Sequence, residues 1–321
     1  MKWLVFAAGV LIVGLVLAVW MAGRQTDARI AILEASSRLI ETRHGTLEYA
    51  EWGQGPAVLV LHGAGGGFDQ GTLLANAIGP DGYRYISVSR FGYLRSALPQ
   101  DATTSAQAEA LADLMDALDI ERANLLAMSG GVPPALRFAA LFPRRTGKLI
   151  LLSSAPITPF SPDIGGRPIP TWVYSALLGN DALYWLLSYG ARSQLQAAFD
   201  ARGDLLATAS DEERRFVDAL IDGFLPASQR LPGLNNEGAA VNPDIDYALA
   251  TITAPALVVH TRDDRMNPVG IGGYIAERLP NAAYRELPNG GHLLLGHHAS
   301  VRERVTRFLT GDTPSSGQGQ R

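Results

Sequence analysis

The 321-residue chain contains no cysteine, which excludes disulfide bonds and any chemistry that depends on a thiolate. This absence leaves the redox compartment undecided. Blocks of like charge are also lacking, since 27 Lys and Arg residues are interspersed with 31 Asp and Glu residues for a net charge of −4. We therefore expect no nucleic-acid partner. The His, Asp and Glu residues show no metal-ligand spacing such as H-E-x-x-H, so we expect no metal and no other cofactor.

Charge is missing altogether near the N-terminus, where Trp3 to Ala22 holds no charged residue. Twenty helical residues span about 30 Å, which is the thickness of a bilayer's hydrocarbon core. Trp3 and Trp20, one near each end, fit the aromatic belts at the membrane interfaces. The stretch predicts a transmembrane anchor over residues 1–23 and a single-pass membrane protein, with a juxtamembrane segment over residues 24–37.

Two alternatives to the anchor are a cleaved signal peptide and a core helix. The apolar core of a signal peptide runs for about 7–15 residues, and cleavage after Ala22 would put bulky Trp20 at the −3 position.

The orientation in the membrane is less clearly indicated by charge. Lys2 on one side faces Arg24 and Arg29 on the other, so the positive-inside rule is nearly balanced. The very short N-terminal tail favours an N-terminus inside the cell and a catalytic domain outside the cytoplasm.

An apolar run breaks at Ser129, in the sequence Asn124-Leu-Leu-Ala-Met-Ser-Gly-Gly-Val132, and a helical pattern follows. A strand-to-helix turn sharp enough to expose a serine Oγ forces strained backbone angles, so the residues two before and two after must be small. Here they are Ala127 and Gly131. An ordinary turn remains the alternative for this motif taken alone.

Further polar motifs follow short apolar runs of the kind buried in a parallel sheet. Ala57–Leu61 ends in His62-Gly-Ala-Gly-Gly-Gly67, and Tyr85–Val88 leads into Ser89-Arg-Phe-Gly-Tyr93. Later, Ala256–His260 is followed by Thr261-Arg-Asp-Asp-Arg-Met-Asn-Pro268, and Leu287-Pro-Asn-Gly-Gly-His292 puts a histidine on a glycine-rich loop.

Taken together over residues 38–310, these motifs resemble the α/β-hydrolases, in which the chain order is serine, acid, histidine. The resemblance implies a mostly parallel eight-stranded sheet flanked by helices, with an inserted helical cap. In the family the acid lies three residues after a glycine that closes the seventh strand and four before a proline. Thr261 takes the place of that glycine, which makes Asp264 the expected acid and leaves Asp263 to solvent or a loop partner.

The expected catalytic residues are Ser129, Asp264 and His292. A serine hydroxyl needs a base to take its proton, and the base needs a third group to fix its tautomer. The developing oxyanion needs preorganised N–H donors. Gly130 is expected to supply one, and Ala64 the other, with Gly65 as the alternative.

The glycine-rich stretch also mimics a dinucleotide site, because Gly63-Ala-Gly65 follows a strand and Arg90 follows the next one. The third glycine of that fingerprint would fall at Phe68, which rejects the interpretation. Arg90 is expected to be structural.

The β/α alternation stops between Ser153 and Asp246, and the intervening segment looks mostly helical. The predicted organisation is a hydrolase core over 38–155 and 246–310, a cap over 156–245 and a disordered tail over 311–321. The cap is expected to govern substrate choice, although its aromatic residues could instead only glue cap to core. The expected substrate-binding residues are His62, Phe68, Trp172, Tyr184, Trp185, Asn235 and Asn236.

The sequence thus predicts a membrane-anchored serine hydrolase that cleaves a small, apolar carboxylic ester through an acyl-enzyme on Ser129. An aminopeptidase, a thioesterase, a lactonase or a C–C hydrolase would use the same residues, and these alternatives stay open. A catalytically silent binding or sensor module is disfavoured because all three triad residues are present.

Overall fold

A computed structural model describes residues 2–157, 159, 179–237 and 246–311 of the chain. Its centre is one eight-stranded sheet with the order β1-β2-β4-β3-β5-β6-β7-β8. The first two pairings, β1 with β2 and β2 with β4, are antiparallel, and the remaining ones are parallel. The strands are β1 (Arg38–Thr42), β2 (Gly45–Trp52), β3 (Ala57–Leu61), β4 (Arg84–Ser89), β5 (Ala123–Met128), β6 (Thr146–Leu152), β7 (Ala256–Thr261) and β8 (Ala282–Leu287).

Strand β3, in the middle of the sheet, is apolar throughout because helices cover both faces of the sheet. In β3 every residue is buried, and Leu59 and Leu61 join one core cluster while Val58 and Val60 join the other. Such an alternation follows from the strand geometry, in which successive side chains point to opposite faces. The structure confirms the predicted eight-stranded, mostly parallel sheet flanked by helices.

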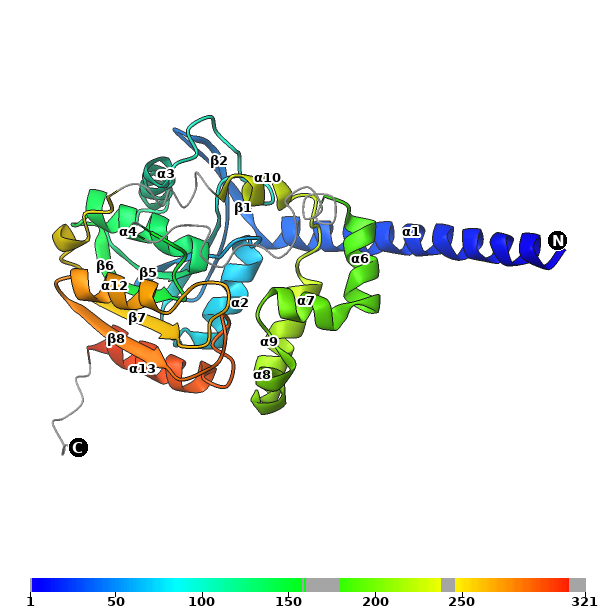
Figure 1. Cartoon of the computed structure of the whole chain (residues 1–321). Coiled ribbons are helices and arrows are strands. Elements are labelled where there is room, and N and C mark those ends of the chain that lie inside the picture. The colour runs from blue at the N-terminus through cyan, green and yellow to red at the C-terminus, as the bar shows by residue number, and fades with distance from the viewer. Residues whose placement is uncertain (1, 158, 160–178, 238–245, 312–321) are drawn as a thin grey trace.

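The helices of the core form a layer on each side of the sheet (Figure 1). Residues of α3, α4 and α12 share the first cluster, and residues of α2 and α13 share the second. These helices are α2 (Phe68–Ile78), α3 (Thr104–Ala117), α4 (Val132–Leu141), α12 (Gly270–Arg278) and α13 (His298–Thr310).

A helical segment stands between β6 and β7, where the sequence predicts the cap. Its described helices are α6 (Asp181–Gly190), α7 (Arg192–Ala198), α8 (Gly203–Thr208), α9 (Asp211–Asp222) and α10 (Leu231–Asn235). Ser210 and Glu213 form a capping box at the start of α9, which explains why the helix begins there. The 3-10 turn Leu249–Thr251 leads back into the core.

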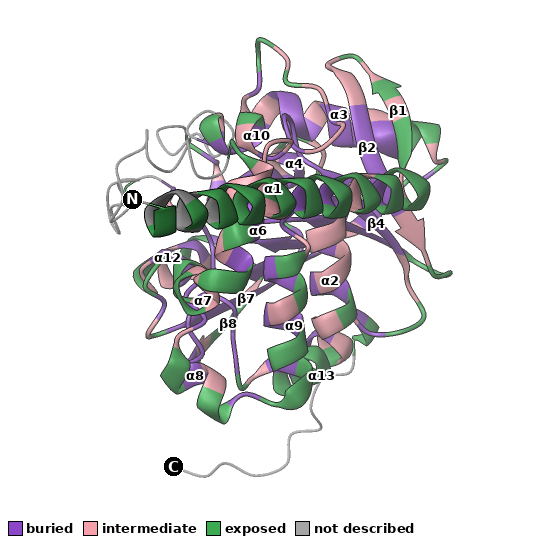
Figure 2. Cartoon of the chain, turned by 90° about the vertical axis from the view of Figure 1, so that its right-hand side faces the viewer, coloured by how far each residue is buried: buried purple, intermediate pink, exposed green. Residues whose placement is uncertain are grey.

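The N-terminal helix α1 (Lys2–Ser36) runs without a break through the predicted anchor and the predicted juxtamembrane segment. Its N-terminal part projects away from the body of the molecule, and its later turns lie beside α6 (Figures 1 and 2). Ala22 is buried there against Tyr184 and Trp185.

In the part of the chain that the structure describes, no helix is long and apolar enough to cross a membrane. The transmembrane anchor predicted over residues 1–23 is therefore not supported by the structure.

Candidate active site

Ser129 lies at the turn between β5 and α4, in a short 3-10 turn over Ser129–Gly131. Its φ of +52° places a non-glycine residue in the left-handed region, a strain that is typical of functional sites. Crowding explains the small neighbours. A Cβ on Gly131 would lie 2.4 Å from the Leu61 carbonyl oxygen, and one on Gly63 would lie 3.2 Å from the Ser129 Cβ. The local geometry is that of the predicted sharp strand-to-helix turn, the nucleophile elbow of α/β-hydrolases.

His292 and Asp264 meet above the ends of β7 and β8. The His292 Nδ1 lies 2.9 Å from the Asp264 Oδ2, and both side chains are almost fully buried. The other oxygen, Asp264 Oδ1, accepts hydrogen bonds from the backbone N–H groups of Met266 (2.8 Å) and Asn267 (2.9 Å). The carboxylate is thus fixed by its own loop while it orients the imidazole, which leaves His292 Nε2 as the nitrogen that can act as a base.

The two groups shift each other's pKa in opposite directions. Burial alone would lower the pKa of His292, but the Asp264 carboxylate, with a further contribution from Asp200, raises it above its usual value. Burial alone would raise the pKa of Asp264, but His292 and His260 hold it well below its usual range. Asp264 is therefore an anion at neutral pH, as a residue that stabilises an imidazolium must be.

Two residues that the sequence analysis did not single out complete this cluster. The His260 Nε2 lies 3.0 Å from the Asn267 carbonyl oxygen and 3.3 Å from the Asp264 Oδ2. The Asn267 Nδ2 donates to the Ser153 carbonyl oxygen at 3.0 Å and to the Ser129 Oγ at 3.4 Å. Among the described residues, no hydrogen bond joins Ser129 Oγ to His292. A base often moves into contact with its nucleophile only when substrate is bound.

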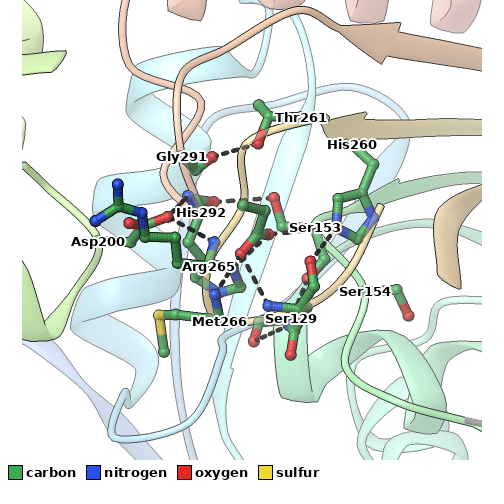
Figure 3. Close-up of polar contacts among 12 residues, drawn as sticks. Ser129, Ser153, Ser154, Asp200, His260, Thr261, Arg265, Met266, Gly291 and His292 are labelled. Carbon is green, nitrogen blue, oxygen red and sulfur yellow. Dashed lines mark hydrogen bonds and ion pairs between the residues drawn. The ribbon is translucent and has the colours of Figure 1, made fainter. Parts of the chain in front are cut away.

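The loop that carries His292 is held from the cap and from β6 (Figure 3). Asp200, between α7 and α8, accepts hydrogen bonds on Oδ2 from the backbone N–H groups of His292 (2.9 Å) and Arg265 (3.1 Å). The Ser153 hydroxyl donates to the His292 carbonyl oxygen at 2.9 Å. Thr261, which stands where the family has a glycine, uses its hydroxyl to hold the carbonyl oxygen of Gly291 at 2.8 Å.

The predicted oxyanion donors lie close together. A Cβ built on Gly130 would lie 3.4 Å from the Ala64 nitrogen, so the two backbone segments face one region. The alternative donor Gly65 is already engaged, because its N–H points to the Tyr93 hydroxyl at 3.2 Å. The geometry therefore favours Ala64 and Gly130 over Gly65 as the pair of donors.

His62 and Phe68, which were expected to bind substrate, serve the scaffold. The His62 Nε2 accepts from the Arg90 N–H (2.9 Å), so its Nδ1 carries the proton and donates to the Gly63 carbonyl oxygen (2.6 Å). Burial and the Arg90 charge hold the pKa of His62 well below its usual value. Phe68 is buried against Leu33 of α1. Both residues therefore stabilise the fold around the loop that carries the candidate oxyanion donor Ala64.

The cap residues that were expected to bind substrate make other contacts. Tyr184 stacks on Phe224 and donates to the Ile221 carbonyl oxygen, and Trp185 donates to the Gln25 side chain of α1 at 2.6 Å. The partners of Tyr184 thus lie within the cap and the partner of Trp185 lies in α1, so both rings pack, but not between cap and core as the alternative in the sequence analysis had it. Asn235 is exposed, and the Asn236 amide points to the Ala102 carbonyl oxygen at 3.5 Å. Trp172 lies outside the described residues.

The comparisons with known proteins decide the family. Residues 56–299 match the family described as the alpha/beta hydrolase fold. The chain belongs to the α/β-hydrolase family. Among curated relatives of this hydrolase, a 2-hydroxy-6-oxononadienedioate/2-hydroxy-6-oxononatrienedioate hydrolase from Pseudomonas putida is 30% identical over 293 residues, covering 86% of this chain and 97% of the relative. A 2-hydroxy-6-oxo-6-phenylhexa-2,4-dienoate hydrolase from Burkholderia cepacia is 29% identical, with 79% and 87% covered.

Solved structures agree on the fold of the hydrolase. An alpha/beta hydrolase fold protein from Nakamurella multipartita superposes with a TM-score of 0.74 at 27% identity, covering 87% of this chain and 100% of that one. An enol-lactonase from Burkholderia xenovorans gives a TM-score of 0.65 at 21% identity, covering 85% and 100%.

Proposed function

We propose that the protein is a serine-dependent C–C bond hydrolase that acts on a small 2-hydroxy-6-oxo-dienoate-like acid. The observation that carries the proposal is the similarity, over nearly their whole length, to hydrolases named for substrates of this type. Ser129, Asp264 and His292 are the candidate catalytic residues for this reaction. The sequence had left a C–C hydrolase open as an alternative to its ester hydrolase, and the relatives favour that alternative.

The proposed reaction begins with the 6-oxo carbonyl in the oxyanion hole formed by the backbone N–H groups of Ala64 and Gly130. Ser129 Oγ attacks the carbonyl carbon, and His292 Nε2 takes the hydroxyl proton. The C5–C6 bond then breaks heterolytically. Because the 2-hydroxyl proton first moves to C5 to give the 2-keto form, the electron pair passes through the C3=C4 double bond to the C2 oxygen, which takes a proton from His292.

The products of this step are an acyl-enzyme on Ser129 and a free enol or keto acid. A water molecule, deprotonated by His292, attacks the acyl carbonyl and releases the second acid. Asp264 stabilises the imidazolium that forms in both halves of the reaction.

The test uses purified protein and 2-hydroxy-6-oxo-6-phenylhexa-2,4-dienoate, whose conjugated chromophore is lost on cleavage. We expect stoichiometric benzoate, with one oxygen atom from ¹⁸O-labelled water, and no product with Ser129→Ala. If the dienoate stays intact while p-nitrophenyl esters are hydrolysed, the C–C proposal is wrong and the ester hydrolase predicted from the sequence takes its place.

The apolar ester that the sequence favoured ranks second because the cap aromatics on which it depended have other partners. Tyr184 and Trp185 face α1 and α9. An ester would still be attacked through the same acyl-enzyme, so ester hydrolysis serves as a convenient assay of Ser129.

The location of the protein is a separate proposal. We propose that the N-terminal part of α1 attaches the protein to a membrane, with the catalytic domain outside the cytoplasm. It is supported by the uncharged sequence from Trp3 to Ala22 and by large apolar side chains exposed along it, among them Trp3, Phe6 and Trp20. We expect the protein to sediment with membranes and to resist carbonate extraction. Full release by carbonate, or a mature form starting near Val19, would contradict the proposal.

A further inference from the structure

A buried ion pair lies beside the candidate oxyanion hole and takes no part in the triad. Arg90, in the loop after β4, contacts Glu237, just after α10, with 2.5 Å between Nη2 and Oε1. The two side chains are only 2% and 10% exposed. The Tyr93 hydroxyl also donates to Glu237 Oε1. Burying two charges is costly unless every polar atom of the pair is hydrogen-bonded.

Two polar atoms of this pair are not hydrogen-bonded. In the described part of the chain, Arg90 Nη1 and Glu237 Oε2 are buried and have no partner. The other nitrogens of Arg90 are satisfied, since Nε donates to the His62 carbonyl oxygen at 3.0 Å. One free donor and one free acceptor therefore remain within one neutral ion pair, and buried unpaired groups of this kind call for an explanation.

The free carboxylate oxygen lies against Gly130, the residue after Ser129. A Cβ built on Gly130 would lie 2.9 Å from Glu237 Oε2, 3.1 Å from Arg90 Nη2 and 3.4 Å from the Ala64 nitrogen. The same small region is thus bordered by the two candidate oxyanion donors and by the ion pair. A substrate whose carbonyl oxygen sits in the oxyanion hole would bring a polar group a few bonds away within reach of the pair.

Charge decides what kind of group fits. The pair is neutral as a whole, so a buried carboxylate or ammonium would add a charge that nothing nearby balances. A carboxylate would also meet the lone pairs of Oε2, and an ammonium would leave Nη1 without an acceptor. A hydroxyl is neutral, donates to a carboxylate oxygen and accepts from a guanidinium N–H.

We propose that Arg90 and Glu237 form a subsite that binds a hydroxyl group of the substrate, an alcohol or an enol, next to the scissile carbonyl. The hydroxyl donates to Glu237 Oε2 and accepts from Arg90 Nη1. The inference goes beyond the proposed function, because this hydroxyl lies on the acyl side of the scissile bond, whereas the 2-hydroxyl for which the relatives' substrates are named lies on the other side. It makes Glu237, a residue of the cap, a determinant of specificity.

The experiment compares p-nitrophenyl hexanoate with its 3-hydroxy and 6-hydroxy derivatives, which differ only in one hydroxyl. A site built around a hydroxyl rejects the analogue that lacks it, so we expect kcat/KM to favour one of the two hydroxy esters about tenfold or more. Glu237→Gln should reduce this preference several-fold. The double variant Arg90→Met/Glu237→Leu, which removes both charges and so leaves no unpaired one, should abolish it.

Glu212→Gln on α9 is the matched control, because Glu212 is an exposed carboxylate of the same cap. Its preference should equal that of the unmodified protein. Protection of Ser129 from a fluorophosphonate probe by 3-hydroxyhexanoate or 6-hydroxyhexanoate, relative to hexanoate, reads the same preference without turnover and without any variant. Equal rates and equal protection for hydroxylated and plain compounds would overturn the subsite, as would a preference that survives the double variant.

The two proposals fail in different ways. Ester hydrolysis and fluorophosphonate labelling use Ser129 whether or not a C–C bond is ever cleaved. An intact dienoate together with a hydroxyl preference would therefore refute the proposed reaction and keep the subsite, and the converse result would do the opposite.

Discussion

Replacing Asp200 by Asn tests whether a cap residue tunes the catalytic histidine. The Asp200 carboxylate is 2% exposed and accepts the His292 N–H at 2.9 Å. Two opposite charges roughly 6 Å apart attract by about 0.7 kcal/mol in water and by about 2.8 kcal/mol at an effective dielectric constant of about 20. The partner of Asp200, Arg202, lies 2.5 Å from its Oδ1 and offsets part of this attraction. We therefore expect Asp200→Asn to lower the pKa of His292.

The assay is the pH profile of kcat/KM for a p-nitrophenyl ester. His292 must be neutral to take the Ser129 proton, so activity rises as pH increases through the pKa of His292, which the carboxylates raise. In Asp200→Asn this rise should move to lower pH. Asp200→Ala, which also removes the acceptor of two backbone N–H groups, should in addition cost about 2–6 kcal/mol of stability.

The raised pKa of His292 also makes the stability of the fold depend on pH. Because the pKa of His292 is raised in the folded protein, the imidazolium contributes stability that is present below the unfolded-state pKa and is lost as pH rises through the folded-state pKa. Asp204→Asn is the control, because Asp204 is an exposed carboxylate that also pairs with Arg202, at 3.6 Å from its Nε. A profile of Asp200→Asn that stays in place, or moves to higher pH, would refute the reasoning.

Three further predictions concern the triad and the cap. Ser129→Ala should lower turnover by a factor on the order of 10⁶ with an unchanged circular dichroism spectrum, and near-normal hydrolysis would rule out this nucleophile. Asp264→Asn should reduce kcat by about 10⁴-fold, whereas Asp263→Asn should have a far smaller effect because Asp263 binds Arg202 instead of His292; the reverse ranking would mean that the acid is misassigned. Trp185→Ala should destabilise the protein by about 2–4 kcal/mol in thermal unfolding and leave acyl-chain preference intact, since its ring packs between cap and α1; a changed preference would return Trp185 to the pocket.

The three candidate catalytic residues could be proposed from the sequence because each follows a strand in a loop with its own signature. Ser129 needs small neighbours, and His292 follows two glycines. Parallel strands bring their carboxyl ends to one edge of the sheet, so the order of strands along the chain was enough to predict that these side chains meet. Asp264 could be separated from Asp263 only by its spacing from Thr261 and Pro268.

The contacts between cap and core could not be found this way. Asp200 lies in the turn between α7 and α8 and Glu237 lies just after α10. Nothing in the sequence around them indicates that one reaches His292 and the other Arg90. The aromatic residues misled for the same reason: Tyr184 and Trp185 would suit a substrate wall or a packing surface equally well, and only the position of α1 shows which one they form.

The sequence by itself determined the fold, the elbow and the identity of the three candidate catalytic residues, because periodicity and turn chemistry are local properties of the chain. The tertiary structure decided what surrounds them: Asn267 against the nucleophile, Asp200 against the base loop, and a neutral Arg90–Glu237 pair with two free atoms beside the oxyanion donors. The residues joined by these contacts lie 138, 92 and 147 positions apart in the sequence. Their energies depend on burial and on exact partners, which no local pattern encodes.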